Sequence, residues 1–349
     1  MNAKEYFYKN FDDKYAMHLD SDLISKLRVA YPLQEDNIKY ISNAYAKRAD
    51  LKYGNDLLMN TIVMDFLANN RMLCVDDNIF LGKLANEYAH CYLVKENEEL
   101  SGALICYTSG LSEISYLAAK LFIANQLLKQ TEKDDIKTIL LKYKDYLIHD
   151  FAYRLLHYDL DIDFASLFDD SDFENLYPDV FMFKSADFAS MIDKFFISHE
   201  LAHYFIEKND TAFVKKVSSI SRLIFDEAFE MFENEVFADI GGVLIFLGYD
   251  DICNIELQTS KIVSSFNRKV QIDVIGTFAL IYAIFILSLI NQKDNWYDYS
   301  KRYKTISKTM YLFDGSTMLV NAIEFNTIIS EIHNYYQGIK KDNDMKDEN

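Results

Sequence analysis

Only 2 prolines and 10 glycines are distributed over the 349 residues of this chain. These two residue types disfavour helix interiors most strongly, so their scarcity leaves few places where regular backbone has to end. Long amphipathic stretches fill the intervals, for example 111–130 (LSEISYLAAKLFIANQLLKQ) and 135–156 (DIKTILLKYKDYLIHDFAYRLL). Apolar residues recur in them at helical spacing. The sequence therefore predicts a mainly helical protein.

Segments that read as strands are few. NIFLG at 78–82 is one, and AHCYLVK at 89–95 and GALICYTSG at 102–110 form a predicted hairpin across the polar turn ENEELS. We expect 102–110 to form a sheet edge to which an extended peptide could add by backbone pairing. The predicted fold class is α+β, predominantly α-helical, with a small sheet.

We expect four regions along the chain. They are an N-terminal helical extension at 1–55, a core at 56–250, a C-terminal helical region at 251–340 and a disordered tail at 341–349. The length is compatible with about two domains or with one continuous body. The tail is predicted from its run of charged and polar residues, which offers no apolar surface to bury.

The charge balance limits the partners. With 54 acidic and 36 basic residues the formal charge is −18, which opposes sequence-independent affinity for nucleic acid or anionic lipid. Neutral or basic partners are expected, and a segment without Lys or Arg at 155–183 could admit a basic substrate. No secretory signal is evident, and four dispersed cysteines predict free thiols in the cytoplasm: Cys74, Cys91, Cys106 and Cys253.

One apolar segment allows a different location. Residues 274–290 (VIGTFALIYAIFILSLI) carry no charge, and basic residues follow, including Lys293, Lys301, Arg302 and Lys304. The run lies at the lower limit of a membrane span, and polar side chains interrupt it. A protein this apolar also needs a helix that is buried on all sides. The sequence favours a buried helix, with a membrane span as the alternative.

The motif with the clearest chemistry is HELAH at 199–203. On a helix His199 and His203 lie on one face about one turn apart, so both imidazoles can reach one zinc ion while Glu200 lies beside it. The helix is expected to begin near Ser185 as its N-cap and to run to Lys208, because no Gly or Pro intervenes. Glu200 is the expected general base.

A catalytic zinc needs a third protein ligand, commonly a carboxylate from a later helix. The segment 225–242 (FDEAFEMFENEVFADIGG) predicts such a helix, ending at its two glycines. Glu235 is the first choice for the ligand, followed by Glu230 and Glu227. Glu235 has Asp239 four residues later on the same face. The Asp239 carboxylate could hold a ligand imidazole in the right tautomer without binding the metal itself.

These residues carry a resemblance. HELAH followed about 30 residues later by ENEVFAD resembles the zinc site of gluzincin metallopeptidases, and CYTSGLSEISYLAAKLF resembles the segment before the active-site helix in bacterial phage-exclusion peptidases of the Lit type. The resemblance implies a zincin-like core in which His199, His203 and Glu235 bind zinc. It also implies that Glu200 is the general base and that Asp239 orients a ligand imidazole without binding the metal itself. The sequence has Ala202 where many members have glycine, and His333 and Tyr335 are only candidates for a transition-state donor.

The sequence therefore predicts a zinc-dependent endopeptidase, a hydrolase acting on a protein or peptide substrate. Two alternatives remain open. One is a catalytically silent interaction protein that keeps the zinc scaffold as structure, and the other is a membrane-embedded gluzincin with a span at 274–290.

Overall fold

The structure is a computed structural model, and it describes part of the 349-residue chain. The described residues are 2–11, 70, 79–84, 90–96, 99–156, 185–208, 210–225, 234–249, 302, 304–310, 312, 331 and 334.

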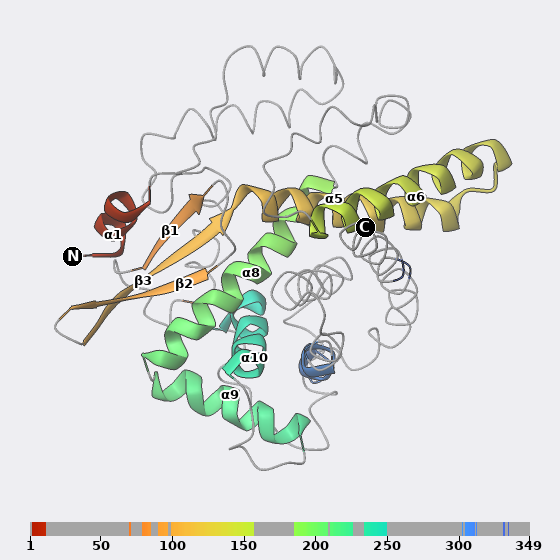
Figure 1. Ribbon diagram of the computed structural model, residues 1–349. Helices are drawn as coiled ribbons and strands as arrows, with labels where there is room; N and C mark the ends of the chain where they lie inside the picture. The colour runs from red at the N-terminus through yellow and green to blue at the C-terminus, as the bar shows by residue number, and fades with distance from the viewer. Residues whose placement is uncertain are drawn as a thin grey trace, which may run out of the picture.

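Helices dominate the described residues, with one small sheet beside them (Figure 1). The helices are α1 (Ala3–Asn10), α5 (Ser109–Gln130), α6 (Asp134–Leu156), α8 (Ser185–Glu207), α9 (Thr211–Ile224) and α10 (Asn234–Leu247). The strands are β1 (Ile79–Leu84), β2 (His90–Glu96) and β3 (Glu99–Thr108). The predicted fold class, α+β and mainly helical, is confirmed at this level.

The sheet has the order β1-β3-β2, with β1 parallel and β2 antiparallel to β3. The predicted hairpin is confirmed as β2–β3. The prediction that 102–110 forms an edge is wrong, because β3 pairs on both sides and is the central strand. A strand's own sequence specifies its alternation of side chains, whereas its neighbours are chosen by the rest of the fold. Within the described sheet, β1 and β2 are the edges.

The two faces of the sheet are covered differently. Helix α1 packs on one face, where Phe7 contacts Phe80 and lies against Gly82 so closely that a Cβ there would be 2.3 Å from its ring. Leu104 and Cys106 belong to the same buried cluster. The opposite face, which includes Ile105 and Tyr107, joins the main core with α5 and α8.

Helix α8 runs through the middle of the molecule (Figure 1). It packs against α5 on one side and α10 on another, and most of its apolar side chains are buried. The helix begins at Ser185, as predicted, and continues without interruption through the HELAH motif to Glu207. The Ser185 hydroxyl has no hydrogen-bond partner among the described residues, so the predicted side-chain cap is not formed.

The predicted helix at 225–242 is wrong at both ends. Phe225 is the C-cap of α9 in an extended conformation, so it does not start the next helix, and the described helix α10 spans Asn234–Leu247. Gly241 and Gly242 lie inside α10 rather than after it, and the helix ends near Gly248, whose φ of 96° favours glycine. The glycines in the helix interior serve close packing, as shown below.

In the described part of the chain, we find no helix with the length and apolarity needed to cross a membrane. Residues 274–290 and 341–349 lie outside the described residues, as does nearly all of the segment at 155–183. The four predicted regions therefore stay predictions. Described residues from the C-terminal region do reach the core, where Ile306 and Met310 are fully buried.

Candidate metal centre

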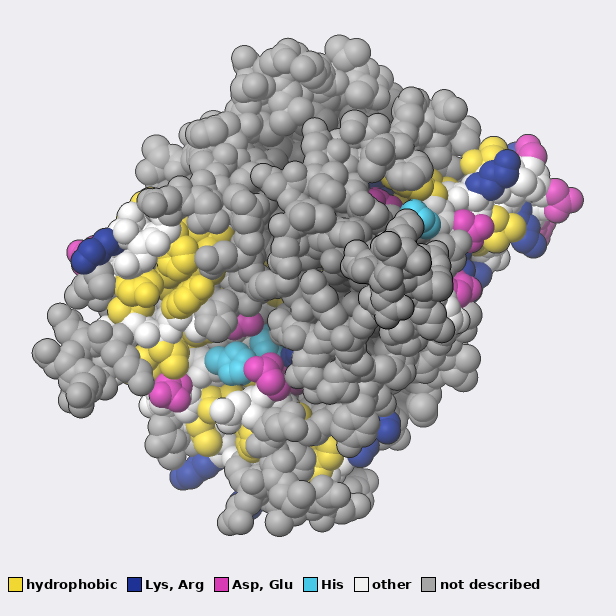
Figure 2. Space-filling view, in the orientation of Figure 1, with side chains coloured by type: hydrophobic (Ala, Val, Ile, Leu, Met, Phe, Trp, Pro, Cys, Tyr) yellow, Lys and Arg dark blue, Asp and Glu magenta, His cyan; other side chains and the backbone are white. Residues whose placement is uncertain are grey.

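Three side chains from two helices come together where α8 packs against α10. Figure 2 shows histidine and acidic side chains next to each other on this face of the molecule. His199 and His203 come from successive turns of α8, and Glu235 comes from the first turn of α10. The side chain of His199 is 2 % exposed, that of His203 is 25 % exposed and that of Glu235 is 47 % exposed. The centre is thus buried on one side and open to solvent on the other.

The distances between these donor atoms match the edges of a zinc tetrahedron. His199 Nε2 lies 3.2 Å from His203 Nε2 and 3.2 Å from Glu235 Oε2, and His203 Nε2 lies 3.5 Å from Glu235 Oε1. With zinc–ligand bonds of about 2.0–2.2 Å, neighbouring ligands of a tetrahedral ion lie about 3.3–3.6 Å apart. Two imidazoles and one carboxylate also form a known catalytic zinc donor set. The residues therefore fit the metal that the sequence predicts.

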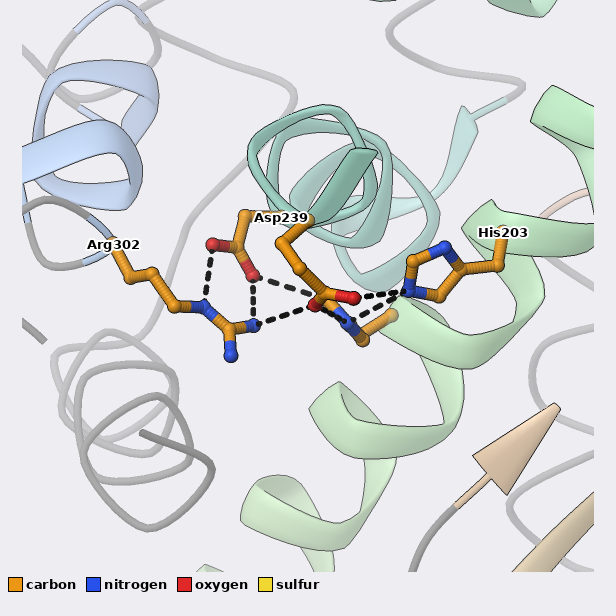
Figure 3. Close-up of polar contacts among 5 residues, drawn as sticks. His203, Asp239 and Arg302 are labelled. Carbon is orange, nitrogen blue, oxygen red and sulfur yellow. Dashed lines mark hydrogen bonds and ion pairs between the residues drawn. The ribbon is translucent and has the colours of Figure 1, made fainter. Parts of the chain in front are cut away.

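Behind the centre, Asp239 connects His199 to an arginine (Figure 3). The Asp239 side chain is 0 % exposed, and its Oδ1 lies 3.0 Å from Nδ1 of His199. The Arg302 guanidinium donates two hydrogen bonds to the same carboxylate, from Nε to Oδ2 at 2.9 Å and from Nη2 to Oδ1 at 2.6 Å. Because Asp239 faces Nδ1, Nε2 of His199 stays directed at the metal position.

Arg302 is a residue of this centre that the sequence did not identify. In the sequence it is one of the basic residues that follow the apolar segment 274–290, whereas in the structure its side chain is 2 % exposed and Nη2 also lies 3.8 Å from Oε2 of Glu235. Nothing in the local spacing separates Arg302 from its basic neighbours. The only signal was indirect, since a carboxylate buried as deeply as Asp239 needs a compensating cation.

The ionisable groups of the centre shift one another's pKa values. Burial alone would lower the pKa of His199, but its contacts with Asp239 and Glu235 outweigh burial and raise that pKa from 6.5 to about 9. Burial would raise the pKa of Glu235, but His199, His203 and Arg302 hold it well below its usual range. Asp239 likewise has a lowered pKa, because Arg302 and His199 outweigh its burial. Near neutral pH, His199 therefore carries a proton that a metal must displace.

This displacement predicts a pH dependence of metal binding. Zinc requires the unprotonated nitrogen, so binding near neutral pH should release about one proton from His199. Apparent zinc affinity should rise about tenfold per pH unit from about pH 7 to about pH 9 and level off above it. A competition titration against a chelator of known pH dependence measures this slope. An affinity that does not change with pH would contradict the predicted protonation of His199.

The same proton also acts on the stability of the metal-free protein. A pKa raised above 6.5 in the folded state stabilises the fold below pH 6.5, and this contribution is lost as the pH rises to about 9. Zinc should thus stabilise the protein most at the upper end of this range.

Asp239→Asn should weaken zinc binding by about 10- to 100-fold, because the amide cannot replace the carboxylate that orients His199. Arg302→Lys is the companion variant. It keeps the positive charge but loses the two-pronged contact with Asp239, so we expect a smaller loss of affinity. Zinc affinity measured by competition checks both. Unchanged affinity in Asp239→Asn would reduce Asp239 to a structural partner of Arg302.

The two helices can approach this closely because of the glycines in α10. A Cβ at Gly242 would lie 3.0 Å from Cα and 3.2 Å from the backbone nitrogen of His199. A Cβ at Gly241 would lie 2.9 Å from Cβ of Ala202 and 2.8 Å from the ring of Phe213. The backbone of α10 thus crosses α8 at the first histidine of the motif, which brings Asp239 and Glu235 within reach of both histidines.

Gly242→Ala tests this crossing. In an ordinary helix interior the change is stabilising by about 1 kcal/mol, but overpacking against backbone typically costs about 1–3 kcal/mol. We expect a net loss of stability and weaker zinc binding, because α10 carries Glu235 and must shift. Denaturant unfolding and zinc titration on one preparation measure both effects. A more stable variant with unchanged zinc affinity would show that the crossing tolerates a methyl group.

Glu200, the expected general base, lies on the same helix as the two histidines. Its residue is 7 % exposed and lies between the two histidines on α8. Its charge acts on Cys91 of strand β2, where burial first and then Glu200 raise the pKa of the thiol. The Glu200 charge therefore lies near strand β2, which packs against α8.

Other predicted residues are outside the described part of the chain. They are the alternative ligands Glu227 and Glu230 and the candidate donors His333 and Tyr335. Among the described residues, His199, His203 and Glu235 are the one group of three His, Cys, Asp or Glu side chains with metal-binding spacing. Comparisons with protein-family models, curated proteins and solved structures gave no match.

Proposed function

We propose that this protein is a zinc-dependent endopeptidase of the gluzincin type, with a zincin-like core. In this proposal His199, His203 and Glu235 hold the zinc ion, Asp239 orients His199, and Glu200 is the general base. The observation that carries the proposal is the convergence of two imidazoles and one carboxylate, with donor atoms 3.2–3.5 Å apart, between the helix that carries Glu200 and its neighbour α10. The motif alone predicts two of these atoms, whereas the third comes from a different helix.

In this proposal the metal ion and Glu200 have separate tasks in catalysis. Zinc supplies Lewis acidity, which polarises a peptide carbonyl and lowers the pKa of a water molecule towards about 7. Glu200 accepts a proton from the attacking water and then donates a proton to the leaving amine. Burial of Glu200 and His199 excludes bulk water from one side of the site, which strengthens both steps.

The edge position of strand β2 supports the proposal that the substrate is a peptide or protein. Within the described sheet, strand β2 has β3 as its single neighbour, and it packs close to α8. An extended peptide can add to such an edge by main-chain hydrogen bonds, with side-chain pockets supplying selectivity. The net charge of −18 favours a neutral or basic substrate. Cys91 and Cys106 form no disulfide, as expected for the proposed cytoplasmic location.

The test is metal content and proteolysis on the same full-length preparation. We expect one zinc per chain, cleavage of members of a broad peptide library, loss of cleavage with a chelator and recovery on adding zinc. Stoichiometric zinc without cleavage of any peptide would favour the interaction protein that uses zinc structurally. Absence of zinc binding at pH 8 would reject both.

A further inference from the structure

A second polar cluster lies on α8, away from the metal centre. The carboxylate of Asp193 accepts a hydrogen bond from the hydroxyl of Tyr107 at Oδ1 and one from Ser112 Oγ at Oδ2, the latter at 3.4 Å. Asp193 is 1 % exposed and Tyr107 is 0 % exposed. The cluster joins α8 to the C-terminal end of strand β3 and to the start of α5.

These bonds give α8 a directional contact with the sheet. Tyr107 also contacts Phe196 of α8, with 6.3 Å between ring centroids, and most of the surrounding core is apolar. Apolar burial stabilises packing without fixing the rotation of a helix, whereas hydrogen bonds to a buried carboxylate are directional and costly to break. Burial and the Asp193 charge both raise the pKa of Tyr107, which keeps its hydroxyl protonated as a donor.

Asp193 is in register with the proposed base. Glu200 follows it by seven residues, so the two side chains lie on the same face of α8, about two turns apart. This face is directed at the sheet. Asp193 meets Tyr107 of β3, and Glu200 acts on Cys91 of β2, whose partner in the register is Ile105 of the same sheet face. Asp239 contacts α8 from the side of α10 through His199, and Arg302 binds the same carboxylate.

We propose that Asp193 is a positioning residue that, through Tyr107 and Ser112, sets the rotation of α8 against the sheet and thereby the place of the Glu200 carboxylate beside strand β2. The consequence for catalysis rests on the proposed function of Glu200. The positioning itself does not, so it can be tested without turnover.

The experiment uses Cys91 as a reporter of the Glu200 position. The full-length protein is treated with iodoacetamide at pH 8, and alkylation of Cys91 is followed by mass spectrometry of its peptide. The proteins compared are the wild type, Tyr107→Phe, Glu200→Gln and the double variant. Tyr143→Phe, in a buried tyrosine of α6, is the matched control for loss of a hydroxyl. If Tyr107→Phe does not fold, Ser112→Ala replaces it in the same cycle.

We expect Tyr107→Phe to change the Cys91 rate by about twofold or more, because the thiolate fraction follows the distance to the Glu200 charge. In the Glu200→Gln background the same substitution should have no further effect, since the charge that it displaces is gone. Tyr143→Phe should leave the rate unchanged. No change in Tyr107→Phe, or an equal change in both backgrounds, would overturn the inference, because the effect would be absent or would not pass through Glu200.

Turnover separates this inference from the proposed function. If the wild type cleaves peptides, Tyr107→Phe and Asp193→Asn should lower kcat by about 10- to 100-fold at unchanged KM and zinc content, as expected when a base is displaced by about 1 Å. A wild type that cleaves nothing would reject the peptidase, whereas the alkylation cycle would still decide whether Asp193 positions Glu200.

Discussion

Glu200→Gln is expected to lower kcat by about 10²- to 10⁴-fold without changing zinc content. The amide has nearly the volume of the carboxylate, so the packing of this 7 %-exposed residue and the ligand side chains should be preserved. It cannot accept a proton from water near neutral pH, however, and general-base catalysis is lost. The measurement is peptide cleavage with zinc quantified on the same preparation.

The matched control for this variant is Glu207→Gln. Glu207 lies seven residues after Glu200 on the same face of α8, but it is exposed at the end of the helix. It experiences the same change in charge and should keep wild-type turnover. If Glu200→Gln retained full turnover, Glu200 would not be the base, and a different acceptor on the open side of the centre would have to be sought.

His203→Ala is expected to abolish stoichiometric zinc binding. It removes one of three donor atoms, and the remaining Nε2 and carboxylate cannot form the closed side of a tetrahedral site. Metal that binds only the folded state stabilises it, so the wild type should unfold at a higher temperature with zinc than with a chelator. That difference should vanish in His203→Ala. His149→Ala, in an exposed histidine of α6, should behave as the wild type.

Glu235→Ala extends this test to the third ligand. It should cost most of the zinc affinity because no other described carboxylate has metal-binding spacing to both histidines. Undiminished stoichiometric zinc in Glu235→Ala would transfer the third ligand to Glu230 or Glu227, which lie outside the described residues. Retained zinc in His203→Ala would be more serious, because it would remove the central geometric argument for the metal site.

Local features of the fold could be predicted from the sequence. Helical spacing without Gly or Pro was sufficient for α8, because the periodicity of a helix is contained in its own residues. The same holds for the β2–β3 hairpin, whose strands are joined by a short polar turn. Helix ends were less predictable. The segment predicted as one helix at 225–242 contains Phe225, which ends α9, and Gly241 and Gly242, which lie inside α10 rather than after it.

The candidate site was likewise predictable within one helix but not between helices. The sequence determined that His199, Glu200 and His203 share one helix, because four residues of α-helix amount to about one turn. It also ranked Glu235 first and linked it to Asp239 by their spacing. Whether those carboxylates meet the histidines depended on the crossing of α8 and α10 at Gly242, which is a contact between residues far apart in the sequence.

The partners behind the site depend on contacts between distant parts of the chain. Arg302 reaches Asp239 across 63 positions of sequence, and Tyr107 reaches Asp193 across 86. Neither pair has a periodic signature, because a buried carboxylate needs a donor or a cation nearby in space but at no particular distance along the chain. The sequence therefore predicts which residues of one helix face could bind zinc. The fold decided which distant side chains complete that centre and hold the helix in place.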